Sequence, residues 1–384
     1  MKIIAREGAA RTSGTLLLAS AILLTLMGVL HILSAMLPRA FMGESDAVLL
    51  IVKQVTFVVA AAVVCLFTSR IDYHRLVDAA PRILLVVWVA LLVVLALPAV
   101  NGARRWLNVG PFGLQASELA KLAVVLGAAW YVDRRSAVIK SYFKGFLPAA
   151  LGLGVTVGLV AAEPDFGTSL FLIATAGILL FLGGVSIRHI LITGLAALPL
   201  FVAVMIDKFR HVMDRLSSFR DGPHEQVERA IEAMGAGGVM GVGLGQTRSS
   251  LWFVPYVETD FVYAAVGEQF GLLGTLSVLA LFLVFLWHGL RIAVLAPDQR
   301  GFLVAFGLTF VVVFQALINM TVVTGLVPPK GIGLPFVSYG GSSLIVLGML
   351  VGVLLSVARV GRQEEPELTL SIATLAPGAS KEGD

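Results

Sequence analysis

Long apolar runs with few charges recur along the whole chain, and they constrain its fold more than any other feature. A helix of about 20 apolar residues spans the roughly 30 Å hydrocarbon core of a bilayer. Such runs lie at about residues 15–37, 48–68, 82–100, 117–132, 146–162, 167–184, 188–206, 261–288, 301–325 and 342–359. They predict an all-α polytopic membrane protein with about ten transmembrane helices.

Composition agrees with a membrane environment. The chain is 58% hydrophobic and 14% charged, whereas about a quarter of the residues in a soluble domain are charged. The net charge of +4 is small, and no nucleic-acid partner is expected. Cys65 is the single cysteine, so an intrachain disulfide and a cysteine-based metal site are both excluded.

The chain ends are polar. Lys2, Arg6 and Arg11 precede the first run, which is too long for the apolar part of a signal peptide and is not followed by a convincing cleavage site. We therefore interpret it as the first span of one transmembrane domain over residues 1–362. Residues 363–384 contain two prolines and several small residues, and we expect a disordered cytoplasmic tail.

The distribution of basic residues predicts the orientation. With a cytoplasmic N-terminus, the short outer loops hold only Arg39, Arg104, Arg105 and Lys330. The inner segments hold Lys2, Arg6, Arg11, Arg70, Arg75, Arg82, Arg134, Arg135, Lys140, Lys144, Arg188, Arg291, Arg300, Arg359 and Arg362. This is the positive-inside bias, and an even number of spans then places both termini in the cytoplasm.

One polar segment is much longer than a minimal connection. Residues 207–260 follow the seventh run and hold six Lys/Arg and eight Asp/Glu. Loops of this length are usually functional or disordered. The predicted orientation places the segment outside the membrane, and its partly apolar stretches at 227–234 and 250–257 predict short surface helices with glycine-rich joints.

A basic cluster lies at residues 101–121. Arg104 and Arg105 precede Trp106, a residue type that favours the bilayer interface. Guanidinium groups bind oxyanions in bidentate fashion, so the pair suits a phosphate, although a solvated loop anchored by Trp106 is the simpler alternative. Glu118 and Lys121 lie one turn into an apolar span. Ionisable groups there are functional candidates, and a structural ion pair is the alternative.

Two further clusters have structural as well as functional interpretations. Residues 163–168 predict a tight turn, whose Glu163 and Asp165 could also hold a cation or a basic partner. Residues 235–246 are rich in glycine, including Gly243 and Gly245. No strand precedes them, which excludes a dinucleotide loop. Glycine at this density predicts tight turns, or close approach of the backbone to a ligand or another helix.

Two features remain on the outer side. Asp260 lies where the eighth run begins, either as a helix-start carboxylate or as an interfacial group able to accept a proton. Residues 325–343 contain too much proline and glycine for a regular helix, and irregular backbone at membrane depth normally lines a cavity. Its structural residues include Pro335, Gly340 and Gly341, and its polar groups include Lys330, Ser338 and Ser342. No metal-binding histidine spacing or nucleophile motif is present, and no metal site is certain.

Four stretches carry a family resemblance: GARRWLNVGPFGLQASELAKL, AAEPDFGTSL, GAGGVMGVGLGQ followed by ETDFVYAAVGE, and PPKGIGLPFVSYGGSS. In order and spacing they resemble the SEDS proteins (shape, elongation, division and sporulation). Pro-Lys-Gly before Leu-Pro-Phe is more similar to the division branch, FtsW, than to the elongation branch, RodA. The chain departs from the family at Pro255-Tyr-Val-Glu-Thr-Asp260, where the family has its glutamate directly after the proline.

The resemblance implies a peptidoglycan glycosyltransferase of the bacterial cytoplasmic membrane. Such proteins polymerise lipid II, an undecaprenyl-pyrophosphate-linked disaccharide peptide, at the outer face, with a class B penicillin-binding protein and other division or elongation proteins. The essential aspartate of the family corresponds to Asp260. Our hypothesis is an inverting transfer with Asp260 as base. The substrate-binding candidates are Arg104, Arg105, Trp106, Glu118, Lys121, Arg210, Lys330, Ser338 and Ser342. A divalent cation (magnesium or manganese) is a candidate cofactor, and no organic cofactor is expected.

Two alternatives remain open. Many spans, broken helices and intramembrane charges also suit a flippase or transporter of lipid-linked precursors. A non-catalytic scaffold of the division complex is the other. The unusual polar groups gather on the predicted outer side, which favours chemistry at that face over passage through the full membrane depth.

Overall fold

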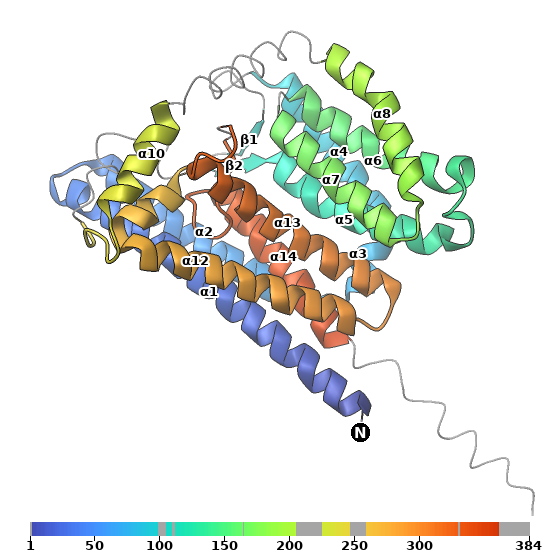
Figure 1. Ribbon diagram of the computed structural model, residues 1–384, viewed down its shortest axis with the longest axis horizontal. Coiled ribbons are helices and arrows are strands. Elements are labelled where there is room, and N and C mark those ends of the chain that lie inside the picture. The colour runs from blue at the N-terminus through green and yellow to red at the C-terminus, as the bar shows by residue number, and fades with distance from the viewer. Residues whose placement is uncertain are drawn as a thin grey trace, which may run out of the picture.

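The computed structural model describes residues 2–98, 105–109, 112–163, 165–204, 225–245, 259–328 and 331–360. Most of the described chain forms helices that pack as a bundle (Figure 1). The main elements are α1 (Lys2–Phe41), α2 (Ser45–Arg70), α3 (Tyr73–Asp78), α4 (Ala80–Ala96), β1 (Trp106–Val109), β2 (Phe112–Gln115), α5 (Ala116–Arg135), α6 (Leu147–Ala162), α7 (Phe166–Leu182), α8 (Ile187–Val204), α10 (Glu225–Ala236), α12 (Val262–Leu295), α13 (Gln299–Val323) and α14 (Gly341–Val360).

The described helices fall on all ten predicted spans, but they differ in length. Six are long and apolar enough to cross a membrane: Gly8–Phe41, Ser45–Arg70, Tyr142–Ala162, Val262–Leu295, Gln299–Val323 and Gly341–Val360. α4 has 17 residues, about 26 Å at 1.5 Å per residue, and α7 and α8 contain similarly short apolar stretches. The chain is therefore a multi-pass helical protein, and the count of ten crossings stays a prediction.

α5 is the central helix of the bundle. It contacts α3, α4, α6, α7, α13 and α14, and most of its residues are buried. Small residues allow this close packing. At Gly127, for example, a Cβ would lie 2.8 Å from Leu84 Cδ1. Helices pack through small residues in membranes because lipid tails supply no hydrophobic driving force between them. Glu118 and Lys121 near the start of α5 are therefore buried among neighbouring helices.

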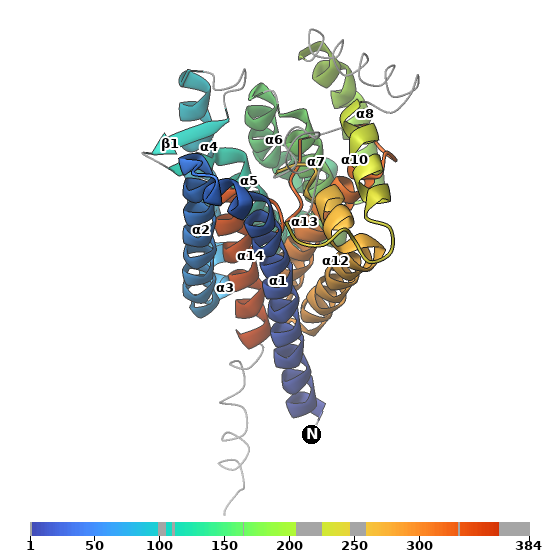
Figure 2. The same cartoon turned by 90° about the vertical axis from the view of Figure 1, so that its left-hand side faces the viewer.

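The expectation of an all-α chain missed one hairpin. β1 and β2 pair antiparallel, with Trp106 opposite Gln115 and Val109 opposite Phe112. The hairpin lies between α4 and α5, where the backbone is not helical and its polar groups need other partners. In Figure 2 it lies toward the same end of the bundle as α10, while the N-terminus lies at the other end.

α12 is interrupted near the hairpin end. Gly271 has a φ of +66° and a ψ of −158°, which breaks the helix. The backbone N–H groups of Leu272 and Leu273 cannot reach their usual helical acceptors. They donate instead to the carbonyl oxygens of Gly238 (2.9 Å) and Val239 (3.3 Å). The N–H groups freed by the break are thus hydrogen-bonded to backbone carbonyls of the glycine-rich segment, residues 237–245.

The same segment also donates hydrogen bonds to the carbonyl groups that precede the break. Val242 N–H donates to the Glu268 carbonyl at 2.9 Å, and Gly243 N–H donates to the Gln269 carbonyl at 3.2 Å. Glycine is required because a Cβ at Gly241 would overlap the Gln269 carbonyl. The prediction of close backbone approach in this segment is confirmed, with α12 as the partner. Before this segment the polar loop forms α10, which covers the predicted helix at 227–234. The predicted helix at 250–257 and the predicted tail from residue 363 lie outside the described residues.

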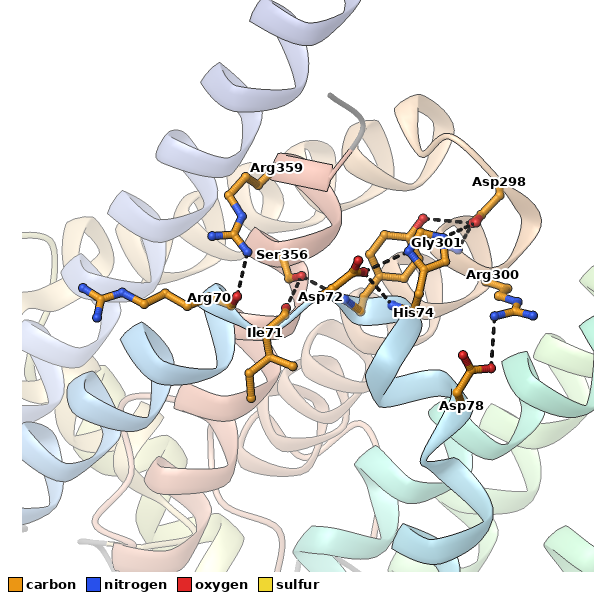
Figure 3. A network of polar contacts seen from close by, with 11 residues as sticks. Arg70, Ile71, Asp72, His74, Asp78, Asp298, Arg300, Gly301, Ser356 and Arg359 are labelled. Atoms are coloured by element: carbon orange, nitrogen blue, oxygen red, sulfur yellow. Dashed lines mark hydrogen bonds and ion pairs between the residues drawn. The ribbon is translucent and has the colours of Figure 1, made fainter. Parts of the chain in front are cut away.

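A polar network surrounds α3 at the opposite end of the bundle (Figure 3). His74 lies between two aspartates, with Nδ1 2.9 Å from Asp72 Oδ1 and Nε2 2.7 Å from Asp298 Oδ2. The Tyr73 hydroxyl donates to Asp298 Oδ1 at 3.1 Å. Burial alone would lower the pKa of His74, but the hydrogen bonds and charges of both aspartates outweigh it and raise that pKa.

The network joins four helices at their ends. Arg300 at the start of α13 donates to Asp133 near the end of α5 at 2.6 Å. The Ser356 hydroxyl on α14 donates to the Ile71 carbonyl at 2.6 Å and accepts the Tyr73 backbone N–H at 3.1 Å. The α3 end of the bundle is therefore held by paired polar groups.

Candidate active site

A cavity of about 390 Å³ opens at the hairpin end of the bundle. Its walls come from the β1–β2 hairpin, the starts of α5 and α7, the turn before α12, one residue of α13, the irregular segment 331–340 and the start of α14. The polar lining residues are Arg105, Gln115, Glu118, Lys121, Asp165, Thr168, Thr259, Asp260, Gln315, Ser338, Tyr339, Ser342 and Ser343, with Trp106 beside them.

Asp260 lies in the turn that precedes α12 and lines this cavity. Phe261 is the N-cap of α12, and no side-chain hydrogen bond caps the helix. Asp260 therefore does not cap the helix, although it lies close enough to the start of α12 for the helix dipole to favour its charge. Burial raises the pKa of Asp260 to about 6, and a hydrogen bond with Thr259 opposes the rise in part. A carboxylate with this pKa can accept a proton near neutral pH.

The predicted pair on α5 forms a buried ion pair at the cavity wall. Lys121 Nζ lies 2.7 Å from Glu118 Oε1 and donates also to Gln315 Oε1 on α13, again at 2.7 Å. It lies 5.8 Å from the centre of the Phe171 ring, a cation–π distance. Lysine has three N–H donors, and the described partners take two. Lys121 itself lines the cavity.

Arg105 and Trp106 enter the cavity from the hairpin side. Arg105 Nε donates to the backbone carbonyl of Glu163 at 3.3 Å, which joins the hairpin to the turn between α6 and α7. Trp106 lines the cavity and is 39% exposed. The guanidinium therefore lies beside the cavity together with Lys121, so two cations face the same space as Asp260.

The turn between α6 and α7 contributes two carboxyl groups. Asp165 lines the cavity and caps α7, accepting the Thr168 backbone N–H at 3.2 Å. Glu163 is fully buried, and neither carboxyl oxygen has a hydrogen-bond partner among the described residues. Burial, followed by the Asp165 charge, raises the pKa of Glu163 to about 8, against the opposing effect of Arg105. Burial thus favours the protonated form of Glu163.

The segment 331–340 is irregular, as its composition predicts, and packs against Asp260. A Cβ at Gly331 would lie 3.1 Å from Asp260 Oδ2. The Ser338 hydroxyl donates to the Thr259 carbonyl and accepts the Leu334 N–H at 2.7 Å. Phe336 has a φ of +67°, which is uncommon for a bulky residue and indicates strong tertiary constraint.

The cavity brings together most of the described site candidates. Those that line it are Arg105, Trp106, Glu118, Lys121, Asp260, Ser338, Gly340 and Ser342. Gly243 and Gly245 belong to the segment against the α12 break, Pro335 lies within the irregular segment, and Gly341 packs on the Phe57 ring. Arg104, Arg210 and Lys330 lie outside the described residues, so their roles stay predictions.

Sequence reasoning overlooked two amides on α13. Gln315 and Asn319 are both buried and lie four residues apart on one helix face. Gln315 Nε2 donates to the Gly333 carbonyl at 3.0 Å, and Asn319 Nδ2 donates to the carbonyls of Asp260 and Ile332. The available signal was two amides at helical spacing in an apolar span.

These features define a multi-pass helical membrane protein with a polar, partly buried cavity at one end of its bundle. The chain matches the sequence family described as cell cycle protein, FtsW/RodA/SpoVE, over residues 14–363. It therefore belongs to the FtsW/RodA/SpoVE family, and the resemblance inferred from the sequence motifs is confirmed.

Individual relatives cover nearly the whole chain. Stage V sporulation protein E of Bacillus subtilis is 36% identical over 363 residues, covering 92% of this chain and 99% of its own length. A probable peptidoglycan glycosyltransferase FtsW of Geobacter sp. (strain M18) is 34% identical, covering 89% and 96%.

Solved structures share the fold. A chain from a peptidoglycan synthase complex that coordinates polymerization and crosslinking superposes with a TM-score of 0.74 at 24% identity, covering 91% of this chain and 98% of that one. The rod shape determining protein RodA of Thermus thermophilus superposes with a TM-score of 0.65 at 25% identity, covering 91% and 97%.

Proposed function

We propose that this chain is a peptidoglycan glycosyltransferase that polymerises lipid II at the cavity described above. Its relatives include proteins named for this activity, and it belongs to their family over almost its whole length. The observation that carries the proposal is one cavity in which a carboxylate with a raised pKa, Asp260, faces Arg105 and Lys121.

The reaction would be a single displacement with inversion at the donor sugar. The 4-hydroxyl oxygen of the acceptor forms a bond to C1 of the donor while the bond from C1 to the pyrophosphate breaks. Asp260 takes the hydroxyl proton, and the undecaprenyl pyrophosphate leaves with the bonding electron pair. One base is sufficient for such a displacement, as in the inverting class of glycoside chemistry.

The cations would stabilise the departing pyrophosphate. Arg105 and Lys121 are placed for this, and fixed donors in a partly dry site act strongly on developing charge. Arg104, Arg210 and Lys330 remain candidates for the same task. Ser342, which is 3% exposed and lines the cavity, is a candidate for sugar contacts. Ser338 is better suited to hold the Asp260 turn, since its hydroxyl already donates to Thr259.

A divalent cation, magnesium or manganese, remains a candidate cofactor. Among the described residues, no three His, Cys, Asp or Glu side chains come together as a metal site. Magnesium is often bound by one or two carboxylates together with substrate phosphates, so phosphate ligands would be needed here. No step of the proposed reaction depends on the ion.

Location and partners follow from the family. We propose that the protein lies in the bacterial cytoplasmic membrane with both termini inside and the cavity at the outer face. A class B penicillin-binding protein is the proposed partner, supported by the shared fold with a chain of a peptidoglycan synthase complex. Division is the proposed role, because FtsW proteins are among the relatives.

The test is polymerisation of labelled lipid II by the purified full-length protein, with and without a penicillin-binding partner. Asp260→Asn should abolish glycan product, because the amide cannot accept the hydroxyl proton. Asp78→Asn is the matched control, since this carboxylate pairs with Arg300 at the opposite end of the bundle. Undiminished polymer from Asp260→Asn would refute the proposed base, and transport of lipid II without polymer would favour a flippase.

A further inference from the structure

The side chain of Asn319 joins two interruptions in the helical backbone. Asn319 is 1% exposed and lies one turn from the end of α13. Its Nδ2 donates to the carbonyl oxygen of Asp260 at 2.7 Å and to that of Ile332 at 2.7 Å. One amide group therefore holds the turn before α12 against the irregular segment 331–340.

Both acceptors are carbonyl oxygens, which determines the orientation of the amide. Only the NH₂ group of asparagine can donate, and it has two hydrogens for two acceptors. The Asn319 Oδ1 atom is buried without a hydrogen-bond partner among the described residues. A buried polar atom without a partner costs free energy. The two hydrogen bonds donated by Asn319 therefore hold the two segments together while its unpaired Oδ1 atom lowers the stability of the fold.

The neighbouring amide on the same face of α13 has a parallel arrangement. Gln315 donates to the Gly333 carbonyl and accepts from Lys121. α13 thus presents two amides, four residues apart, to the irregular segment. One is connected to the Asp260 turn and the other to the Lys121 ammonium group, so the helix sets the distance between the proposed base and a proposed pyrophosphate ligand.

We propose that Asn319 is a positioning residue. By donating a hydrogen bond to the backbone carbonyl of Asp260, it holds the carboxylate of Asp260 in line with the acceptor hydroxyl. The inference rests on the proposed function, because it assigns Asn319 a role in that reaction. Asn319 does not line the cavity, so it acts through Asp260 and not on the substrate.

The decisive variant is Asn319→Leu, which keeps the approximate shape and removes both donors. A misplacement of about 1 Å can cost roughly 100-fold in rate. We expect kcat for polymerisation to fall at least about tenfold, while KM for lipid II changes less than about threefold, because the binding groups are untouched. Without the hydrogen bond from Asn319, the Asp260 side chain should become better hydrated, which lowers its pKa. The acid limb of the rate profile should therefore move to lower pH.

Ser356→Ala is the matched control. Ser356 is also fully buried and also donates to a backbone carbonyl, but it lies at the α3 end of α14. It should lower the thermal unfolding temperature and leave kcat and the acid limb unchanged. If Asn319→Leu does not fold, Asn319→Ala also removes both donors without adding volume, and it should show a fall in kcat with the same constant KM.

The outcomes separate this inference from the proposed function. Suppose that Asp260→Asn is inactive and that every folded Asn319 variant keeps the wild-type kcat and the wild-type acid limb. The positioning role of Asn319 is then refuted, and the assignment of Asp260 as the base stands. If neither Asn319 variant folds, Asn319 is a stability residue and the positioning role is rejected. If Asp260→Asn remains active, the proposed base itself fails, whatever Asn319 does.

Discussion

The two ends of α5, α13 and α14 both contain charged and amide side chains, but these differ in whether their polar atoms have partners. At the α3 end, Arg300 pairs with Asp133, and His74 pairs with two aspartates. At the cavity end, Glu163 and Asn319 retain buried polar atoms without described partners, and the pKa of Asp260 is raised.

Among these particular groups, the paired ones join helix ends and the unpaired or desolvated ones lie at or beside the cavity. Paired polar groups hold helix ends together, whereas unsatisfied or desolvated groups cost free energy and persist where function requires them. The backbone follows the same division. The cavity end contains a hairpin, a broken helix and an irregular segment, while the α3 end contains helix ends, turns, and short 3-10 and π-helical pieces between α5 and α6. The predictions below test this contrast.

The largest effect is expected for Lys121→Met compared with Arg300→Met. The Lys121 and Glu118 side chains are 6% and 12% exposed, so removing the lysine leaves a buried carboxylate without its cation. Breaking such a pair costs about 3–5 kcal/mol, and loss of a charge-stabilising donor reduces the rate roughly 100- to 1,000-fold. Both should be measured, by thermal unfolding and by lipid II polymerisation.

Arg300→Met is the control for the opposite end. Its side chain is 21% exposed and its partners are more exposed, so the loss of stability should be about 1 kcal/mol. The polymerisation rate should remain at the wild-type level. Equal losses of activity in the two variants would remove the functional contrast between the ends.

The second effect is a pH dependence that belongs to the cavity end alone. Burial raises the pKa of Asp260 to about 6, and a protonated base is inactive. The value of kcat/KM should therefore fall about tenfold per pH unit below pH 6. Asp78→Asn should show the same profile. An acid limb near pH 4 would mean that Asp260 is hydrated in the free enzyme or is not the base.

The third effect concerns the glycine-rich segment against the α12 break. Gly241→Ala places a Cβ against the Gln269 carbonyl at a φ of +81°, and such conflicts typically cost about 1–3 kcal/mol. Thermal unfolding should show the loss, and polymerisation should also decline because Asp260 lies at the start of α12. Gly235→Ala, where the added Cβ meets nothing within 4 Å, should be neutral or slightly stabilising.

The smallest effect is expected at His74. Its raised pKa means that its contribution to stability is complete below the unfolded value near 6.5 and disappears as pH rises through the folded value. His74→Gln should therefore reduce the unfolding free energy more at pH 6 than at pH 9, by less than about 1 kcal/mol because the group is partly exposed. A pH-independent loss would show that only neutral hydrogen bonds matter there.

Sequence patterns predicted much of the fold because helices in a bilayer are specified locally. Length and hydropathy located a helix at every predicted span, and the proline- and glycine-rich composition of residues 325–343 predicted the irregular segment. The hairpin was missed because four-residue strands leave little pattern, and Trp106 was interpreted as an interfacial anchor or a substrate-binding residue, not as part of a strand.

The candidate site was predicted in part for the same reason. Arg105, Lys121 and Asp260 attracted attention because charge is unusual beside apolar runs. Neutral amides carry a weaker signal, so Gln315 and Asn319 were not selected. Glu163 was noted, but its isolation from hydrogen-bond partners depends on which side chains surround it, and spacing along the chain does not contain that information.

By itself the sequence determined a multi-pass helical membrane protein, its family and the segments that could carry chemistry, because hydrophobic length and motif order are properties of the chain alone. Only the tertiary structure decided which groups meet. Lys121 and Gln315 are 194 residues apart, and Asn319 and the Asp260 carbonyl are 59 apart. Such contacts arise from the packing of α5, α12 and α13 around one cavity, and packing is settled by shape and close approach between helices, which local hydropathy does not encode.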